Sequence, residues 1–370
     1  MPELMVVAKG LDNVVVDDTA LSRVDGEKGE LIYRGYDIDE LAGCSFEQVC
    51  HLFMYGELPS KEHEKEMRTN LQKRYAIPQE IVDFICRRAQ SDHPMATLRT
   101  SVSMLSCCIE EAPLNDSAAL ISMALDLIAK TGTIAAAINR VRLNKNPVAP
   151  NVSFGYSKNF IYMCNGEIPE DIAVKTMDTA MVLHIDHGFN ASTFTARVVT
   201  SSLSDMISAV TAAIGSLKGP LHGGANTAVM EMLLEIVSLE NVKPWVEKAL
   251  SEKKKIMGFG RRIYRVSDPR AKHLKRMSQE WGERAHEKKW FQMSEAIERL
   301  MLEKKNINAN VDFYSASTYY MMGIEPKMYT PIFAVARMVG WTAHVMEQLK
   351  DNRLMRPEAH YVGPLGKIYK

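Results

Sequence analysis

Helical periodicity dominates this chain, and strand signals are scarce. Apolar residues recur at three- and four-residue steps in SDMISAVTAAIGSL (204–217) and in TPIFAVARMVGWTAHVMEQL (330–349). The clearest strand candidate is a short ribbon, GELIYRGYDI (29–38), which glycines bound. We therefore expect an all-α protein with a deep core, because the segments around 120–140 and 205–217 are almost wholly apolar.

Capping residues indicate where several helices begin. Ser204 and Thr330 stand at expected N-cap positions, and Pro331 follows at a first helical position. In the stretch 267–305, charged residues alternate with an apolar stripe, which predicts a pair of surface helices. Asp268 and Pro269 are expected to cap and open the first of these helices.

Three interruptions rich in glycine, proline or asparagine divide the helices, at 215–226, 306–315 and 322–331. The region between the first and the third is richer in Lys, Arg and Glu than the part before it. We expect a large helical domain formed by residues 1–217 and 323–370 and a small helical domain formed by residues 218–322. Since ligands prefer the clefts between domains, the active site is expected there.

The overall charge excludes several classes of partner. The 370 residues include 45 Lys and Arg and 45 Asp and Glu, so the formal net charge is zero. A general role in binding nucleic acid or a membrane surface therefore has no support. The amino terminus lacks the pattern of a signal peptide, and the six cysteines show no CxxC spacing. We expect a cytoplasmic protein with free thiols and no bound metal.

One short stretch departs from this neutrality. GFGRRIYRVSDPR (258–270) holds four arginines, Arg261, Arg262, Arg265 and Arg270. The stretch is either a solvated helix face or a site for a strongly anionic ligand. It does not read as a dinucleotide-binding loop, because no strand precedes it and no third glycine follows in register.

His222 lies in a glycine-flanked run, KGPLHGGAN (218–226), that opens a helix. The partial positive charge at a helix N-terminus disfavours imidazolium, so a neutral His222 can serve as a hydrogen-bond donor. The glycines would let a ligand approach the backbone closely. The alternative is a turn histidine with a solvated ring.

A second constellation is LHIDHGFNAST, which contains His184, Asp186 and His187. Two histidines and one aspartate fall short of a full metal-ligand set, and no third histidine or cysteine is nearby. A ligand-contacting His187 supported by a carboxylate is the functional interpretation. A buried structural pair is the alternative.

Asp312 lies between a valine and a phenylalanine in NVDFYS. An aspartate in water has a pKa of about 3.9 and is a poor base. Desolvation raises that pKa, which makes Asp312 a candidate general base. A helix cap is the alternative.

Arg270 and two further arginines have the chemistry to hold carboxylates in two-point geometry. Arg270 is expected in the first turn of its helix, near backbone donors. Arg337 shares a helix face with His344, seven residues later, and Arg356 precedes Pro357 in a carboxy-terminal loop.

These runs, taken in order and with VDGEKGELIYRGYDIDEL, FAVARMVGW and RPEAHYVGP, resemble citrate synthase across almost the whole chain. The short amino terminus resembles the compact dimeric members, and the 2-methylcitrate synthases share nearly all of these motifs. The resemblance implies an α-helical fold of a large and a small domain whose cleft closes on oxaloacetate. It also implies a homodimer whose substrates are oxaloacetate and an acyl-CoA, with no cofactor.

The resemblance further implies roles for matched positions. Asp312 would take a methyl proton from acetyl-CoA, and His222 would donate a hydrogen bond to the thioester oxygen. His187 would contact oxaloacetate. The arginines divide into two sets. The carboxylates of oxaloacetate would be bound by Arg270, Arg337 and, from the partner subunit, Arg356. The phosphates of CoA would face Arg262 and Arg265.

One position departs from the family pattern. The family has a histidine where this chain has Arg261, and that histidine binds the ketone oxygen of oxaloacetate and supplies a proton. Arginine can donate hydrogen bonds, but it stays protonated above about pH 12 and is a poor proton donor. Three outcomes follow: a slower synthase, an altered 2-oxo acid preference, or a paralogue that binds ligands without turnover. A synthase that prefers propionyl-CoA is a further alternative.

Overall fold

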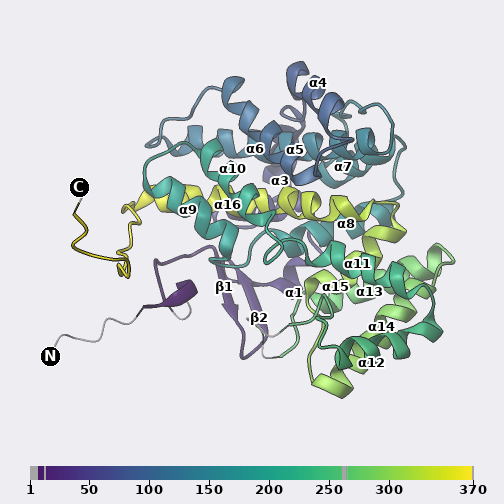
Figure 1. Cartoon of the computed structure of the whole chain (residues 1–370). Coiled ribbons are helices and arrows are strands. Elements are labelled where there is room, and N and C mark those ends of the chain that lie inside the picture. The colour runs from purple at the N-terminus through teal and green to yellow at the C-terminus, as the bar shows by residue number, and fades with distance from the viewer. Residues whose placement is uncertain (1–6, 12–13, 261–263, 265, 369–370) are drawn as a thin grey trace.

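The computed structural model describes residues 7–11, 14–260, 264 and 266–368. In this part of the chain there are sixteen α-helices and one small sheet, so the predicted all-α class is confirmed. Figure 1 shows the sheet beneath one end of the helical body. Its antiparallel strands run in the order β1 (Ser22–Asp25), β2 (Glu30–Tyr33) and β3 (Tyr36–Asp37).

Eleven helices form the body around a long central helix, α16 (Tyr329–Lys350), which packs against several of the others. The other ten are α1 (Ile38–Leu41), α2 (Phe46–Tyr55), α3 (Lys61–Gln72), α4 (Gln79–Arg88), α5 (Pro94–Met104), α6 (Ser117–Arg142), α7 (Tyr156–Asn165), α8 (Asp171–His184), α9 (Ala191–Ser201) and α10 (Met206–Leu217).

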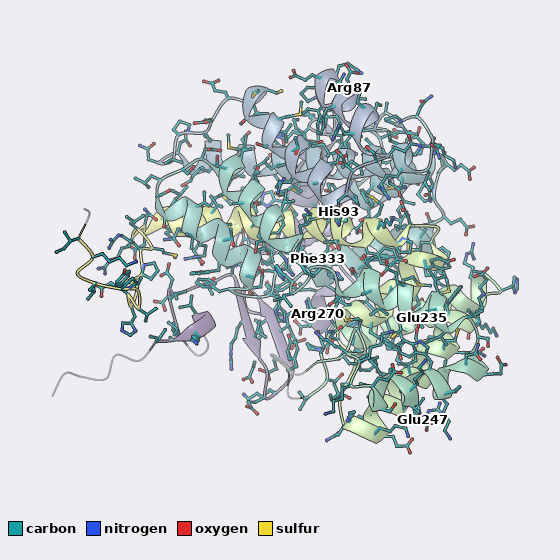
Figure 2. The ribbon with its side chains drawn as sticks, in the orientation of Figure 1. Arg87, His93, Glu235, Glu247, Arg270 and Phe333 are labelled. Carbon is teal, nitrogen blue, oxygen red and sulfur yellow. The ribbon has the colours of Figure 1, made fainter. Side chains whose placement is uncertain are left out.

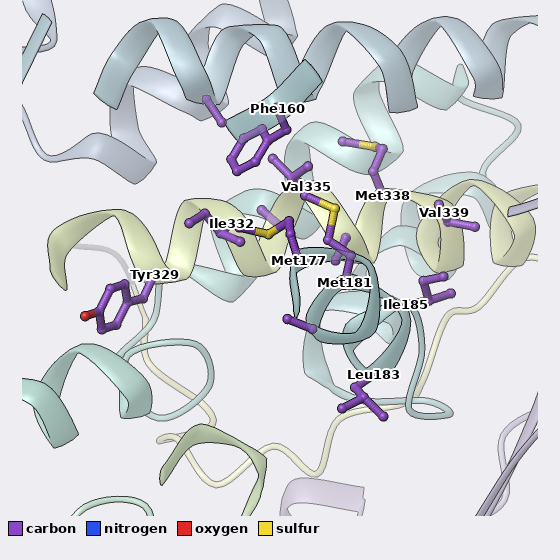
Figure 3. Packing of buried hydrophobic residues seen from close by; sticks show 14 of the residues in the cluster. Phe160, Met177, Met181, Leu183, Ile185, Tyr329, Ile332, Val335, Met338 and Val339 are labelled. Carbon is purple, nitrogen blue, oxygen red and sulfur yellow. The ribbon is translucent and has the colours of Figure 1, made fainter. Parts of the chain in front are cut away.

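The core of this body lies where α16 meets its neighbours. Figure 3 shows Met177 and Met181 of α8 beside Val335 of α16, with Phe160 of α7 above them. All four side chains are buried. Unbranched methionines fill the irregular gaps between such helices, which accounts for many of the 23 methionines of the chain.

The long helix α6 is apolar enough to cross a membrane by length and composition. In its most apolar window, however, 78% of the residues are buried inside the protein. Its N-terminus is capped by Asp116, whose carboxylate accepts the N–H groups of Ala118 and Ala119. The helix is therefore a core element of this fold.

The remaining helices form a second group, which Figure 1 shows at one side of the body. They are α11 (Ala225–Ile236), α12 (Val242–Ser251), α13 (Ala271–Arg284), α14 (Lys289–Lys305) and α15 (Val311–Met321). The chain enters this group after α10 and leaves it before α16, near the expected boundaries. The division into two domains stays a prediction.

The two chain segments that connect the groups, one after α10 and one before α16, contact each other. The Thr330 hydroxyl donates to the Gly223 carbonyl oxygen at 2.8 Å, and the Thr227 hydroxyl donates to that of Pro326 at 2.9 Å. A further contact joins the two groups, since Lys272 of α13 pairs with Asp39 of α1.

Several predicted helix starts are wrong by one or two residues. The cap of α10 is Asp205, not Ser204, because Asp205 accepts the N–H of Ser208. Helix α16 begins at Tyr329, before Thr330 and Pro331. Helix α13 begins at Ala271, with Arg270 at the N-cap. The pair of surface helices predicted for 267–305 is confirmed by α13 and α14.

Candidate active site

The turn that carries His222 lies between α10 and α11. The His222 N–H donates to the carbonyl oxygen of Gly219 at 2.9 Å. A Cβ added to Gly223 would lie only 2.4 Å from the carbonyl oxygen of Leu217. Close packing of the turn on α10 therefore already requires a glycine at position 223, whatever approaches the turn from outside.

The half-buried ring of His222 contacts the N-terminus of α9. Its Nε2 accepts the N–H of Ser192 at 3.2 Å and lies 2.7 Å from the Ser192 hydroxyl. Because this nitrogen is an acceptor, the ring is neutral and its proton lies on Nδ1. The sequence predicts that the N-terminus of α11 keeps His222 neutral. In the structure, the backbone N–H and the hydroxyl of Ser192 in α9 contact the neutral ring instead.

Ser192 itself is fixed from two further sides. Its hydroxyl lies 2.8 Å from Asn190 Oδ1 and accepts the indole N–H of Trp341 at 3.2 Å. Asn190 also caps α9 by accepting the N–H of Thr193. The partner of His222 is therefore rigidly placed between the start of α9 and the middle of α16.

The corner between α8 and α9 is built on Asp186, which is fully buried. Its carboxylate accepts the Ser22 hydroxyl of β1 and lies 3.2 Å from His344 Nε2. Burial opposes ionisation, but His344 and Arg337 outweigh it and hold the pKa of Asp186 at about 2. The Tyr33 hydroxyl donates to the Asp186 carbonyl oxygen at 2.8 Å. Asp186 thus anchors the corner rather than pairing with His187.

His184 and His187 face different partners. The Nδ1 of His184 donates to the Ala180 carbonyl oxygen at 2.6 Å, within its own helix. The Nε2 of His187 lies 3.0 Å from the Tyr264 hydroxyl. Within the described ranges, no three His, Cys, Asp or Glu side chains are grouped so that they could hold a metal ion.

The surroundings of His187 make it uncharged. It is 9% exposed, and burial together with the positive charges of Arg270 and Arg337 lowers its pKa to about 3. At neutral pH it therefore offers one N–H donor and one acceptor.

Arg270 and Asp268 form a buried fork. Arg270 donates from Nε to Asp268 Oδ1 at 3.0 Å and from Nη2 to Oδ2 at 2.8 Å. Burial alone would lower the pKa of Arg270, but Asp268 raises it, so the guanidinium stays charged. Asp268 also accepts the N–H of Val311 at 3.3 Å, which ties α13 to the start of α15. The sequence predicts that Asp268 caps the helix, but its carboxylate forms this fork with Arg270.

Arg337 is 1% exposed and lies on α16. Its Nε donates to the His184 carbonyl oxygen at 2.7 Å, and its guanidinium stacks 4.7 Å from the centre of the Phe333 ring. Burial lowers its pKa to about 10, so it remains a cation at neutral pH. Figure 2 shows Phe333 and Arg270 in the middle of the molecule, where the two groups of helices meet.

Asp312 lies at the N-terminus of α15, where Asn310 accepts its N–H. Asn310, not Asp312, is therefore the cap, and the cap alternative for Asp312 is wrong. Burial raises the pKa of Asp312 to about 6, although Arg270 and Arg337 act in the opposite direction. The Asp312 carboxylate is thus electrostatically linked to the same two arginines whose charges act on His187.

The remaining predicted residues lie elsewhere. Arg261, Arg262 and Arg265 fall outside the described residues. Arg356 is exposed on the carboxy-terminal tail, residues 351–368, which Figure 1 shows leaving the body at the end of α16. Within one chain, Arg356 is therefore not brought to Arg270 and Arg337.

Sequence reasoning missed four residues that hold the site together: Ser192, Tyr33, Tyr264 and Trp341. Ser192 follows Asn190, whose place before an apolar run is a readable N-cap signal. The other three contacts join segments that are far apart in sequence, for which periodicity gives no signal. A cavity of about 530 Å³ between α2, α6 and α16 contains none of the predicted site residues.

Comparison with known proteins identifies the family to which this chain is related. The family described as "Citrate synthase, C-terminal domain" matches residues 10–358. Citrate synthase 2 of Bacillus subtilis is 46% identical over 362 residues, which is 97% of each chain. The 2-methylcitrate synthase of Mycobacterium tuberculosis is 42% identical over 361 residues, 96% of this chain and 91% of that protein.

Solved structures agree as well. The citrate synthase of Thermoplasma acidophilum, in a ternary complex with carboxymethyl coenzyme A and oxaloacetate, aligns over 98% of both chains with a TM-score of 0.93 and 31% identity. The citrate synthase of Thermotoga maritima aligns over 98% of both chains with a TM-score of 0.87 and 36% identity. The chain therefore belongs to the citrate synthase family and is an acyltransferase that forms carbon–carbon bonds.

Proposed function

We propose that the chain condenses acetyl-CoA with oxaloacetate to give citrate and free CoA. The observation that carries this proposal is electrostatic: the buried cations Arg270 and Arg337 act on the buried carboxyl of Asp312, whose pKa is raised, and also on neutral His187. A base and an anion-binding set are what this condensation needs. The ternary complex of the Thermoplasma relative supports the same pair of substrate classes.

In this reaction Asp312 accepts a proton from the methyl group of acetyl-CoA. A thioester methyl is a very weak acid, so the enolate oxygen that develops must be stabilised by a placed donor. His222 fits this role, because Ser192 occupies its Nε2 and leaves the proton on Nδ1. Arg262 and Arg265 would hold the phosphates of CoA.

The enolate carbon then attacks the ketone carbon of oxaloacetate, and the ketone oxygen becomes an alkoxide that takes up a proton from water. Arg270, Arg337 and His187 hold the carboxylates during this step, and Arg261 donates a hydrogen bond to the ketone oxygen. Water finally hydrolyses the citryl thioester, which releases citrate and CoA. The proposed steps use no metal or other cofactor.

The decisive assay follows the release of free thiol from acetyl-CoA in the presence of oxaloacetate. The wild-type protein is expected to turn over, and Asp312→Asn is expected to lose at least about 10²-fold in kcat because the general base is removed. Absence of thiol release by well-folded wild-type protein would refute the proposal.

Propionyl-CoA is a second candidate acyl donor, which the 42% identity with a 2-methylcitrate synthase favours. One additional methylene changes discrimination by only about 1–3 kcal/mol. Comparison of kcat/KM for acetyl-CoA and propionyl-CoA in the same preparation decides between the two donors.

We further propose a homodimer in which Arg356 of the partner subunit completes the carboxylate site. The exposed tail supports this, since it also carries exposed apolar side chains, Val362, Leu365 and Ile368. Mixing Arg356→Ala with Asp312→Asn through unfolding and refolding tests it. If Arg356 acts across the interface, a mixed dimer contains one intact site and activity returns; if it acts within its own chain, no activity returns.

A further inference from the structure

Tyr264 contacts His187 from the loop that precedes α13. Its hydroxyl lies 3.0 Å from His187 Nε2, and the two rings meet edge to face with centroids 5.5 Å apart. Both side chains are buried, at 7% and 9% exposure. Residues 187 and 264 thus meet although they belong to different groups of helices.

The protonation states of this pair follow from its surroundings. Burial and the arginine charges keep His187 neutral, and burial raises the pKa of Tyr264, so the phenol keeps its proton. Within the described residues, Nε2 of His187 is the hydrogen-bond acceptor that the phenol meets. If Nε2 carried the ring proton, the buried phenol proton would face a donor, which is costly.

We infer that Tyr264 is a positioning residue: its O–H donates to Nε2 of His187 and thereby fixes the ring proton on Nδ1. This inference rests on the proposed function for its consequence, because a carboxylate or ketone oxygen of oxaloacetate needs an N–H donor. A neutral histidine that is free to exchange tautomers would present an acceptor to the ligand part of the time.

The first test needs no activity and no change to Tyr264. Nitrogen NMR of the full chain labelled with ¹⁵N-histidine, with His187 assigned by the signal lost in His187→Gln, is expected to show a single tautomer protonated on Nδ1. A resonance pattern with the proton on Nε2 would overturn the inference. In Tyr264→Phe the same signals are expected to shift towards a mixture of tautomers.

The second test is kinetic. Tyr264→Phe is expected to raise KM for oxaloacetate about fivefold to tenfold, the usual effect of one hydrogen bond, with kcat changed less than about twofold. The matched control is Tyr156→Phe, which removes a buried phenol that donates to the Ile128 carbonyl oxygen at 2.8 Å, within the body. Equal KM values in Tyr264→Phe and wild type would contradict the inference.

The two proposals fail in different ways. If the wild-type protein does not consume oxaloacetate, the proposed function is wrong, while the NMR measurement still decides the tautomer of His187. If the wild-type protein is active but His187 is protonated on Nε2, the positioning role alone is wrong.

Discussion

The Nε2 atom of His222 lies 2.7 Å from the hydroxyl oxygen of Ser192 and 3.2 Å from its backbone nitrogen. These two groups belong to the first turn of α9, whose aligned N–H groups favour a neutral ring. A histidine that is already a hydrogen-bond acceptor at Nε2 can act on the substrate only as a donor through Nδ1. The first turn of α9 therefore determines what His222 can do.

Ser192→Ala removes the hydroxyl but keeps the backbone N–H. We expect kcat/KM for acetyl-CoA to fall about tenfold, because one of the two contacts that orient the ring is lost. Steady-state kinetics with saturating oxaloacetate measures the effect. Ser294→Ala is the matched control, since Ser294 is equally buried and donates only to the Trp290 carbonyl oxygen of its own helix at 2.9 Å. If both variants behave alike, Ser192 has no special role.

The pH dependence of the reaction should report Asp312. Its pKa is raised to about 6 by burial, and a proton can be accepted only by the ionised carboxylate. We therefore expect kcat/KM to rise with pH through about 6 and to be level above about 7. Because the folded pKa lies above the ordinary value of 3.8, the contribution of this group to folding stability decreases as pH rises from about 3.8 through about 6.

A pH–rate profile measured from about pH 5 to 8 at subsaturating acyl-CoA checks this expectation. The residual activity of Asp312→Asn should lack the inflection near pH 6. A profile that is level down to pH 5 would contradict the assignment of Asp312 as the base.

Sequence reasoning reached the fold class and the residue types of the site, for reasons that the structure makes clear. Helical periodicity and the apolar composition of α6 and α10 are local in sequence, so the burial of these helices could be predicted. His222 and Asp312 were found because flanking glycines or apolar residues mark them. A carboxylate before Pro269 predicts a helix cap, but Asp268 forms a fork with Arg270, which depends on side-chain geometry that the sequence pattern does not show.

What could not be predicted are contacts between distant segments. Ser22 and Tyr33 of the small sheet hold Asp186, more than 150 residues away, and no pattern within either segment indicates this. The same holds for Trp341 and Ser192. These residues position the chemical groups, and tertiary packing alone brings them together.

Arg261 leads to a prediction about rate. Arg261→His should increase kcat at least about tenfold, because an imidazole can release a proton to the forming alkoxide and a guanidinium cannot. Arg261→Lys is the control, since it keeps a cationic hydrogen-bond donor that remains protonated at neutral pH. An unchanged or lower kcat in Arg261→His would show that position 261 does not limit the reaction.

Asp178 provides a test of stability, away from the predicted site. Burial and the neighbouring carboxylate of Glu47 raise its pKa to about 7. Its Oδ1 accepts the Phe46 N–H at 3.1 Å and the Ser157 hydroxyl at 2.6 Å, and Arg68 lies 3.5 Å from Glu47. Ionisation at alkaline pH therefore places two negative charges beside one partly exposed cation.

A carboxyl whose pKa is raised on folding stabilises the protein fully below its ordinary pKa, and this contribution is lost as pH rises through about 7. Asp178→Asn keeps an oxygen acceptor for Phe46 and Ser157 and cannot ionise. Because the contribution is lost between the ordinary pKa of 3.8 and about 7, we expect Asp178→Asn to stabilise the protein by about 1–3 kcal/mol more at pH 8.5 than at pH 5. Urea unfolding at the two pH values measures the difference. An equal effect at both pH values would mean that packing, not charge, determines the role of Asp178.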